Sequence, residues 1–331
     1  PVQWVLGGEY REEDYKFSSD FTGDPEYIFY GPDGASAHRS TTALFFETLV
    51  PLTLGLELSL SGRYDDYSDW GSEFSPKVSL RWRVNEQLVL RGSWGEGFRA
   101  PPLVMSTLEP REQVFLTDED PQSCEAIGEE SGCTILYLGT AIVSPALSDE
   151  TSEQYSLGLV WDPADWFSQT IDYYDITIND EIGGTAPGNI LEMEALGIPL
   201  PPGLGVKRHP SGLLLEVTYG FANFGETKTS GMDFNTQLSF ELGPGYWRSD
   251  LLWSWVFDYS YTTGDGRSPN TVGYMGVPEM RATLSNAYDI SDFGLTWIVH
   301  YISSQKGSEW DPDDDSKISN WISHDLQASY N

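Results

Sequence analysis

Alternation of apolar and polar residues is the strongest pattern in this chain. Every second residue from Leu52 to Leu60 is leucine, and the residues between them are Thr53, Gly55, Glu57 and Ser59. A period of two places all the leucines on one face of an extended strand. The same alternation recurs along the sequence, which therefore predicts an all-β protein.

The alternation predicts twelve strands. Their expected ranges are Val2–Tyr15, Thr41–Val50, Leu52–Tyr67, Phe74–Val84, Gln87–Phe98, Thr151–Trp161, Phe167–Ile182, Gly225–Leu242, Tyr246–Thr262, Pro278–Asp289, Phe293–Ser303 and Asn320–Asn331. The alternation changes parity near Tyr173 and Tyr174, where we expect a β-bulge.

The connections between these strands alternate between short and long. Short turns are expected at Pro51, Asn85-Glu86, Asp162–Asp165, Gly243–Gly245 and Ser291-Asp292. The other connections are longer, and the longest are Arg99–Glu150 and Gly183 to about Asn223. Dyad-repeat strands with short turns at one end and long loops at the other are typical of a transmembrane antiparallel β-barrel with short periplasmic turns and long extracellular loops.

The polar positions of several strands carry charge. Strand parity predicts that Arg81, Arg83, Arg91, Asp233 and Arg281 face the inside of such a barrel. Charges of both signs require water or a partner surface there, because an unpaired buried charge costs several kcal/mol. The lumen is therefore expected to be an aqueous channel or to hold another protein segment.

Composition limits the kinds of partner and the compartment that suit this chain. The formal net charge of −33 argues against nucleic acid, whose phosphates would be repelled. The 12 Trp and 18 Tyr suit aromatic girdles at two membrane interfaces. Cys124 and Cys133 lie in one loop; they would form a disulfide in an oxidising compartment, which we favour, and remain thiols in the cytosol.

Four segments resemble TonB-dependent outer-membrane receptors. They are RGSWGEGFRAPPL at Arg91–Leu103, SPALSDETSEQYSLGLVW at Ser144–Trp161, IDYYDITI at Ile171–Ile178 and NFGETKTSGMDF at Asn223–Phe234. The segments follow the order found in that family, at the spacing of barrel strands, and together they cover most of the chain.

The resemblance implies a receptor of Gram-negative outer membranes that imports a scarce ligand, such as an iron-siderophore, cobalamin, haem or an oligosaccharide. Such receptors are barrels of about 22 strands filled by an N-terminal plug that meets TonB through a short TonB box. Neither plug, TonB box nor terminal aromatic strand is recognisable here. Residues 1–331 are therefore expected to form about twelve middle-to-late strands, with one further hairpin after Asn331.

Candidate ligand contacts lie in the long loops. Phe98 and Arg99 stand where a strand leaves the membrane, although the same motif also serves to fix the strand-to-loop turn. Loop aromatics, namely Tyr27, Phe29, Tyr30, Tyr137 and Trp310, either stack on a ligand or pack within the loops. The tract Asp311–Asp315 offers oxygen ligands for Ca²⁺, but it lacks the glycine and distal glutamate of an EF-hand and equally suits a solvated loop tip.

Other classes find little support in the sequence. The four histidines are scattered, and no nucleotide-binding, nucleophile-elbow or paired-histidine motif occurs, so neither enzymatic activity nor a cofactor is expected. Two alternatives remain. One is a complete twelve-stranded barrel that acts as a channel or an enzyme, which requires the first strand to pair with the last. The other is a secreted all-β carbohydrate-binding or hydrolytic protein, which requires Leu52–Leu60 to be buried against a second sheet.

Overall fold

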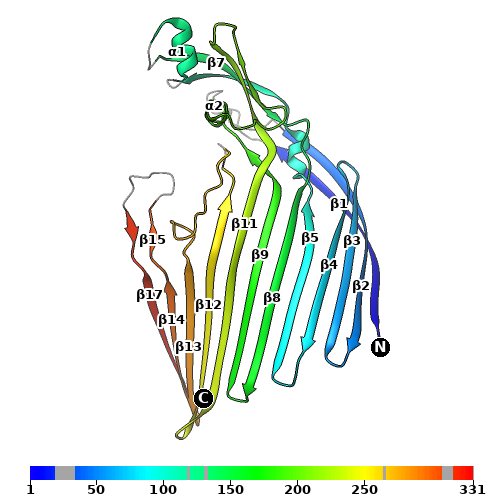
Figure 1. Ribbon diagram of the computed structural model, residues 1–331, viewed down its shortest axis with the longest axis vertical. Helices are drawn as coiled ribbons and strands as arrows, with labels where there is room; N and C mark the ends of the chain where they lie inside the picture. The colour runs from blue at the N-terminus through cyan, green and yellow to red at the C-terminus, as the bar shows by residue number, and fades with distance from the viewer. Residues whose placement is uncertain (19–33, 118–119, 130–132, 264–265, 308–315, 331) are drawn as a thin grey trace.

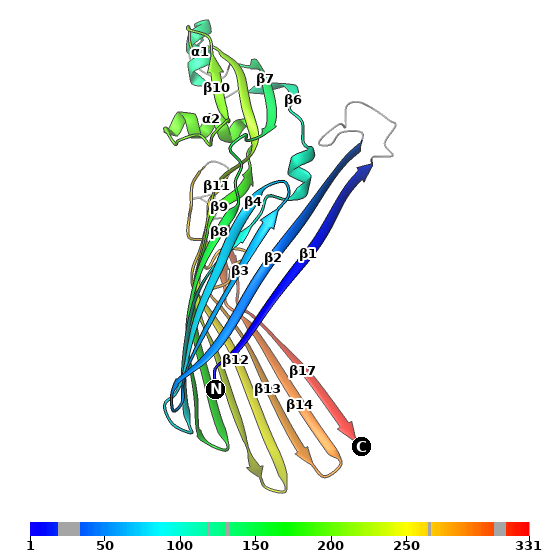
Figure 2. The same cartoon turned by 90° about the vertical axis from the view of Figure 1, so that its right-hand side faces the viewer.

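The chain forms one long, curved antiparallel sheet with a smaller folded unit at one end (Figures 1 and 2). The structure, a computed structural model, describes residues 1–18, 34–117, 120–129, 133–263, 266–307 and 316–330. No helix in these ranges is long and apolar enough to cross a membrane.

Twelve strands make up the path of the sheet, as the alternation predicts. In order they are β1 (Gln3–Ser18), β2 (Gly34–Thr53), β3 (Leu56–Tyr67), β4 (Gly71–Arg83), β5 (Leu88–Arg99), β8 (Glu150–Ala164), β9 (Phe167–Gly184), β11 (Leu214–Leu242), β12 (Gly245–Tyr261), β13 (Met280–Ile290), β14 (Phe293–Ile302) and β17 (Trp321–Tyr330). Within the described part of the chain, β1 pairs only with β2 and β17 only with β14. The sheet is therefore open, which contradicts a closed twelve-stranded barrel.

The two faces of the sheet differ in chemistry. Residues paired directly across antiparallel strands point to the same face, and two adjacent rows can be followed from β3 to β13. One row contains Leu56, Trp82, Leu90, Leu159, Ile171, Phe234, Trp253 and Ala282; the next contains Glu57, Arg81, Arg91, Gly158, Asp172, Asp233, Ser254 and Arg281. We call these the apolar face and the polar face.

Large apolar side chains on the apolar face are exposed. Leu157 is 65% and Trp82 45% exposed to solvent. No second sheet packs on them in the described ranges, since the only other sheet is the two-stranded β15 (Gln305–Lys306) and β16 (Lys317–Ile318). This arrangement contradicts the secreted sandwich, in which the leucines would be buried.

The turn before the leucine strand lies later than predicted. Pro51 pairs with Glu57 inside β2, and the chain turns at Leu54-Gly55. Gly55 has a φ of 83°, a conformation that glycine adopts without steric cost. Leu52 therefore belongs to the preceding strand, and Leu54 to the turn. The alternation of leucines continues through this turn, so it did not reveal where the turn lies.

The bulge predicted at Tyr173 and Tyr174 is also wrong. Pairing of β9 with β8 and with β11 continues without a shift through both residues. The apolar face of β9 ends at Tyr173, because the next positions on that face are Asp175 and Thr177. The change of parity thus marks the end of the apolar face rather than an extra residue.

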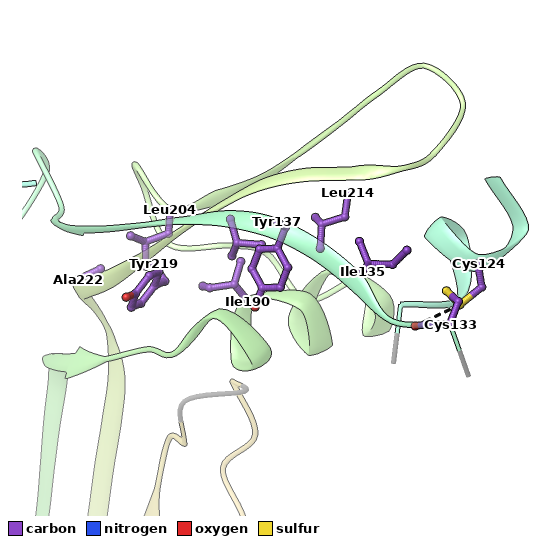
Figure 3. Packing of buried hydrophobic residues seen from close by; sticks show 10 residues of the cluster. Cys124, Cys133, Ile135, Tyr137, Ile190, Leu204, Leu214, Tyr219 and Ala222 are labelled. Carbon is purple, nitrogen blue, oxygen red and sulfur yellow. Dashed lines mark hydrogen bonds between the residues drawn. A yellow bond between two sulfur atoms is a disulfide. The ribbon is translucent and has the colours of Figure 1, made fainter. Parts of the chain in front are cut away.

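The long loops contain a folded unit, which we call the cap. It comprises η2 (Leu103–Thr107), β6 (Arg111–Thr117), α1 (Pro121–Ile127), β7 (Ile135–Val143), α2 (Pro187–Leu196), β10 (Gly205–Arg208) and the first part of β11. β7 pairs in parallel with β11, while β6 and β10 extend this small sheet on either side. Buried side chains including Tyr137, Ile190 and Val217 fill its core (Figure 3).

Candidate functional site

The five charges predicted for the inside of a barrel share one face of the sheet. Arg81, Arg91, Asp233 and Arg281 lie in the polar-face row, and Arg83 lies two residues beyond Arg81 on the same strand. Side chains two residues apart on a strand point the same way. The structure therefore brings these charges together on the polar face.

Two of these arginines make ion pairs along the row. Arg81 contacts Glu57 at 3.2 Å, and Arg91 contacts Asp172 at 2.6 Å. The second pair spans the strand between them, at Gly158. A Cβ atom at Gly158 would collide with Asp172 Oδ1 and lie 2.6 Å from Arg91 Nε, so the pair requires glycine there.

A groove of about 520 Å³ follows the polar face beside these ion pairs. Its lining includes four serines that pair across successive strands, Ser59, Ser79, Ser93 and Ser156. Small hydroxyl side chains leave room and offer both donors and acceptors. Among the described residues Arg83 and Arg281 make no ion pair, so this surface retains cationic groups for a partner.

Phe98 and Arg99 are held within the top of the sheet. The Phe98 ring lies 6.0 Å from that of Tyr67 and stacks on that of Trp70 at 6.3 Å. Arg99 Nη2 donates to Glu150 Oε1 at 2.7 Å, and the same oxygen accepts the Ile182 N–H. Arg99 thereby links β5 to β8 and β9. These contacts agree with a role of the motif in fixing the turn between strand and loop.

Arg39 is a residue that the sequence analysis missed. Its guanidinium is buried, lies over the Tyr67 ring and donates to Asp69 and to the Pro101 carbonyl at 2.8 Å. It therefore anchors the start of the long loop after Arg99. No motif surrounds Arg39, so only the fold reveals its role.

Two cross-links fasten the cap, one within a short loop and one between distant segments. Cys124 and Cys133 form the disulfide that was expected in an oxidising compartment. Arg208, also missed from sequence, donates to Asp120 at 2.8 Å and to Glu194 at 2.6 Å, which joins β10 to α1 and α2.

Ion pairing in the cap shifts the pKa values of Asp120 and Arg208. Burial alone would raise the pKa of Asp120, but hydrogen bonds from Arg208 and Ser123 outweigh burial, and this pKa lies below its usual value. The pKa of Arg208 is raised, chiefly by its hydrogen bond to Glu194 and then by Asp120. The cap is thus held by a partly buried cation between two carboxylates.

Of the other predicted site residues, Tyr137 is not available to a ligand. It was expected among exposed loop aromatics, but it is only 6% exposed and stacks on Phe115 at 5.8 Å within the cap core. Trp310, the tract Asp311–Asp315 and the aromatics Tyr27, Phe29 and Tyr30 lie outside the described residues. Within those residues no group of three or more His, Cys, Asp or Glu could hold a metal ion.

The family of β-barrels described as "TonB dependent receptor-like, beta-barrel" matches residues 1–331. A curated relative, the probable TonB-dependent siderophore receptor PirA of Acinetobacter baumannii, is 21% identical over 93% of this chain but only 38% of its own length. The chain thus spans about two-fifths of that relative.

Solved structures agree on the fold. The crystal structure of the Acinetobacter baumannii siderophore receptor PirA has a TM-score of 0.63 at 14% identity, over 100% of this chain and 46% of that one. A mutant ferric enterobactin receptor PfeA of Pseudomonas aeruginosa, in complex with enterobactin, has 0.64 at 14%, over 99% and 44%. The iron transporter FrpB of Neisseria meningitidis has 0.55 at 14%, over 90% and 39%.

Proposed function

This chain belongs to the TonB-dependent receptor family through its β-barrel, and from that premise we propose that it forms part of the wall of an outer-membrane receptor in a Gram-negative bacterium. The observation that carries the proposal is the apolar face, which exposes Leu157, Trp82 and many similar side chains along the wall. Lipid chains would cover this face, whereas water would make it prone to aggregation.

We propose an iron–siderophore complex as the imported ligand. Of the relatives named above, one is described as a siderophore receptor, one is bound to enterobactin and one is an iron transporter. Cobalamin, haem and oligosaccharides are the competing ligands. Import, rather than chemistry on the ligand, suits a chain whose relatives are transport receptors.

A plug segment of the complete protein is the proposed partner of the polar face. Its groove and the unpaired Arg83 and Arg281 offer hydrogen bonds and positive charge to such a segment. The plug would in turn carry the contact to TonB. Residues 1–331 would then be the partial barrel domain, closed by further strands of the same protein.

Uptake by living cells tests the function. Cells that lack the complete protein should fail to accumulate radioactive iron supplied with the cognate ferric siderophore, and the restored gene should recover accumulation. Removal of TonB should abolish the recovered uptake, because transport across this membrane draws its energy through TonB. Normal ferric-siderophore uptake without the protein, or uptake that ignores TonB, would contradict the proposal.

A further inference from the structure

A second cavity lies where the cap meets the twelve-stranded sheet, which we call the wall, and it is separate from the polar-face groove. It has a volume of about 430 Å³, which falls within the range of small-molecule sites, roughly 300–1,000 Å³. The residues that line it are mainly apolar and come from the segment that leads into β6, from β7 and β11, and from the end of β9 and the start of α2; they include Leu108, Pro110, Ala141, Ile142, Val143 and Phe221. An apolar, partly enclosed space of this size suits a flat organic group.

One cation faces this cavity without a partner. Arg111 opens β6 directly opposite Ala141, and it shares a strand face with Phe115, which packs against the cap core. Nine other arginines in this acidic protein pair with carboxylates. Within the described part of the chain Arg111 makes no such pair, although Glu109 also lines the cavity.

A second donor comes from α2. The side-chain oxygen of Asn189 in α2 accepts the Ala186 N–H at 3.0 Å, which leaves its amide N–H groups for another acceptor. Asn189 lines the same cavity as Arg111. An anionic group at the edge of an apolar body would meet both donors there.

We propose that this cavity is a binding site for a small aromatic carboxylate, with the ring against Val143 and Phe221, which are register partners on the strand face of Arg111, and the carboxylate on Arg111. The guanidinium offers two parallel N–H donors that match the two carboxylate oxygens. A neutral analogue of the same shape would keep the apolar contacts and lose the charge-assisted ones. This site goes beyond the proposed uptake and does not depend on the identity of the imported ligand.

The experiment compares benzoate with benzamide on the complete protein in detergent micelles, by calorimetry or by saturation-transfer NMR. Benzoate should bind more tightly than benzamide, and Arg111→Ala should weaken benzoate binding by at least about tenfold while barely changing benzamide binding. Arg111→Lys should retain part of the preference for benzoate. Lys207→Ala, which removes an exposed cation elsewhere in the cap, is the matched control and should leave both affinities unchanged.

Equal binding of benzoate and benzamide would overturn the proposal, as would an Arg111→Ala protein that binds benzoate normally. A persistent Cys124–Cys133 disulfide and an unchanged near-UV spectrum exclude misfolding of the variants. Failure of benzoate to bind a protein that imports ferric siderophore normally overturns this inference alone. Benzoate binding by a protein that imports no ferric siderophore overturns the proposed function alone.

Discussion

Arg91 and Asp172 form an ion pair across a strand to which neither belongs. Arg91 lies in β5 and Asp172 in β9, and β8 runs between them with Gly158 at the crossing point. Their side chains meet at 2.6 Å above the bare glycine backbone. This glycine is needed for the space above it rather than for its own backbone conformation.

Gly158→Ala should break this ion pair. The added methyl group would occupy the space of Asp172 Oδ1 and Arg91 Nε. Both side chains are substantially exposed, so the loss should cost no more than about 1 kcal/mol of unfolding free energy. Denaturant unfolding of the complete protein in lipid vesicles measures this cost.

The control for that change is Gly95→Ala, since a Cβ at Gly95 meets only ordinary contacts at 3.4 Å. The double variant Gly158→Ala with Arg91→Ala should be hardly less stable than Arg91→Ala alone, because no ion pair is left to break and the unpaired Asp172 carboxylate can rotate away from the added methyl group. If the losses of unfolding free energy in Gly158→Ala and Arg91→Ala simply add in the double variant, Gly158 does not act through this ion pair.

Substitution by arginine distinguishes the two faces of β3. Leu60 lies in the middle of the strand on the apolar face, and Ser59 lies beside it on the polar face. Leu60→Arg should cost about 2–4 kcal/mol if the apolar face meets the bilayer midplane, whereas Ser59→Arg should cost far less. Leu56 is a poorer probe because it begins the strand next to the short turn. An arginine side chain introduced there could extend to the membrane–water interface. Equal costs at Leu60 and Ser59, from unfolding in lipid vesicles, would contradict a lipid-facing wall.

Much of the wall could be predicted because its physics is local. A strand with one apolar and one polar face must alternate, so the residue order from Leu56 to Leu60 already contained the two faces, and parity placed Arg81 and Arg91 together on the polar face. Turns were less certain: Pro51 suggested a break, yet the positive φ that the turn requires is available at Gly55. Proline only removes one donor from the ladder, which a strand near its end tolerates.

The cap could not be predicted because its contacts join distant segments. Tyr137 lies between Leu136 and Leu138 in a segment where apolar residues do not alternate with polar ones, and its burial comes from β11 and α2, more than fifty residues later. The ion pairs of Arg208 with Asp120 and Glu194 have the same origin. No spacing rule links such residues, so sequence patterns described these segments only as long loops.

Removal of the cap disulfide should loosen the cap and spare the wall. The bond between Cys124 and Cys133 closes a short loop, for which the chain-entropy estimate is about 2–3 kcal/mol. The double variant Cys124→Ser with Cys133→Ser should therefore increase hydrogen exchange in α1 and β7, with β3, β4 and β5 unchanged. Exchange that stays the same in α1 would show that the other cap contacts suffice. Exchange that rises equally in the wall would show that the cap and wall unfold together.

Acid should weaken the cap through Asp120. Its pKa in the folded protein lies below the unfolded value of about 3.9, so its pairing with Arg208 contributes fully above that pH. The contribution is lost as pH falls from about 4 through the lower folded pKa, because protonation removes the negative charge. Asp120→Asn should cost about 1–3 kcal/mol of cap stability at neutral pH, since Arg208 keeps Glu194, and should flatten the acid dependence. Hydrogen exchange in α1 and β10, corrected for the intrinsic rate at each pH, measures both effects, with the exposed Glu125→Gln as control. An acid dependence that persists in Asp120→Asn would assign the loss of stability to another carboxylate.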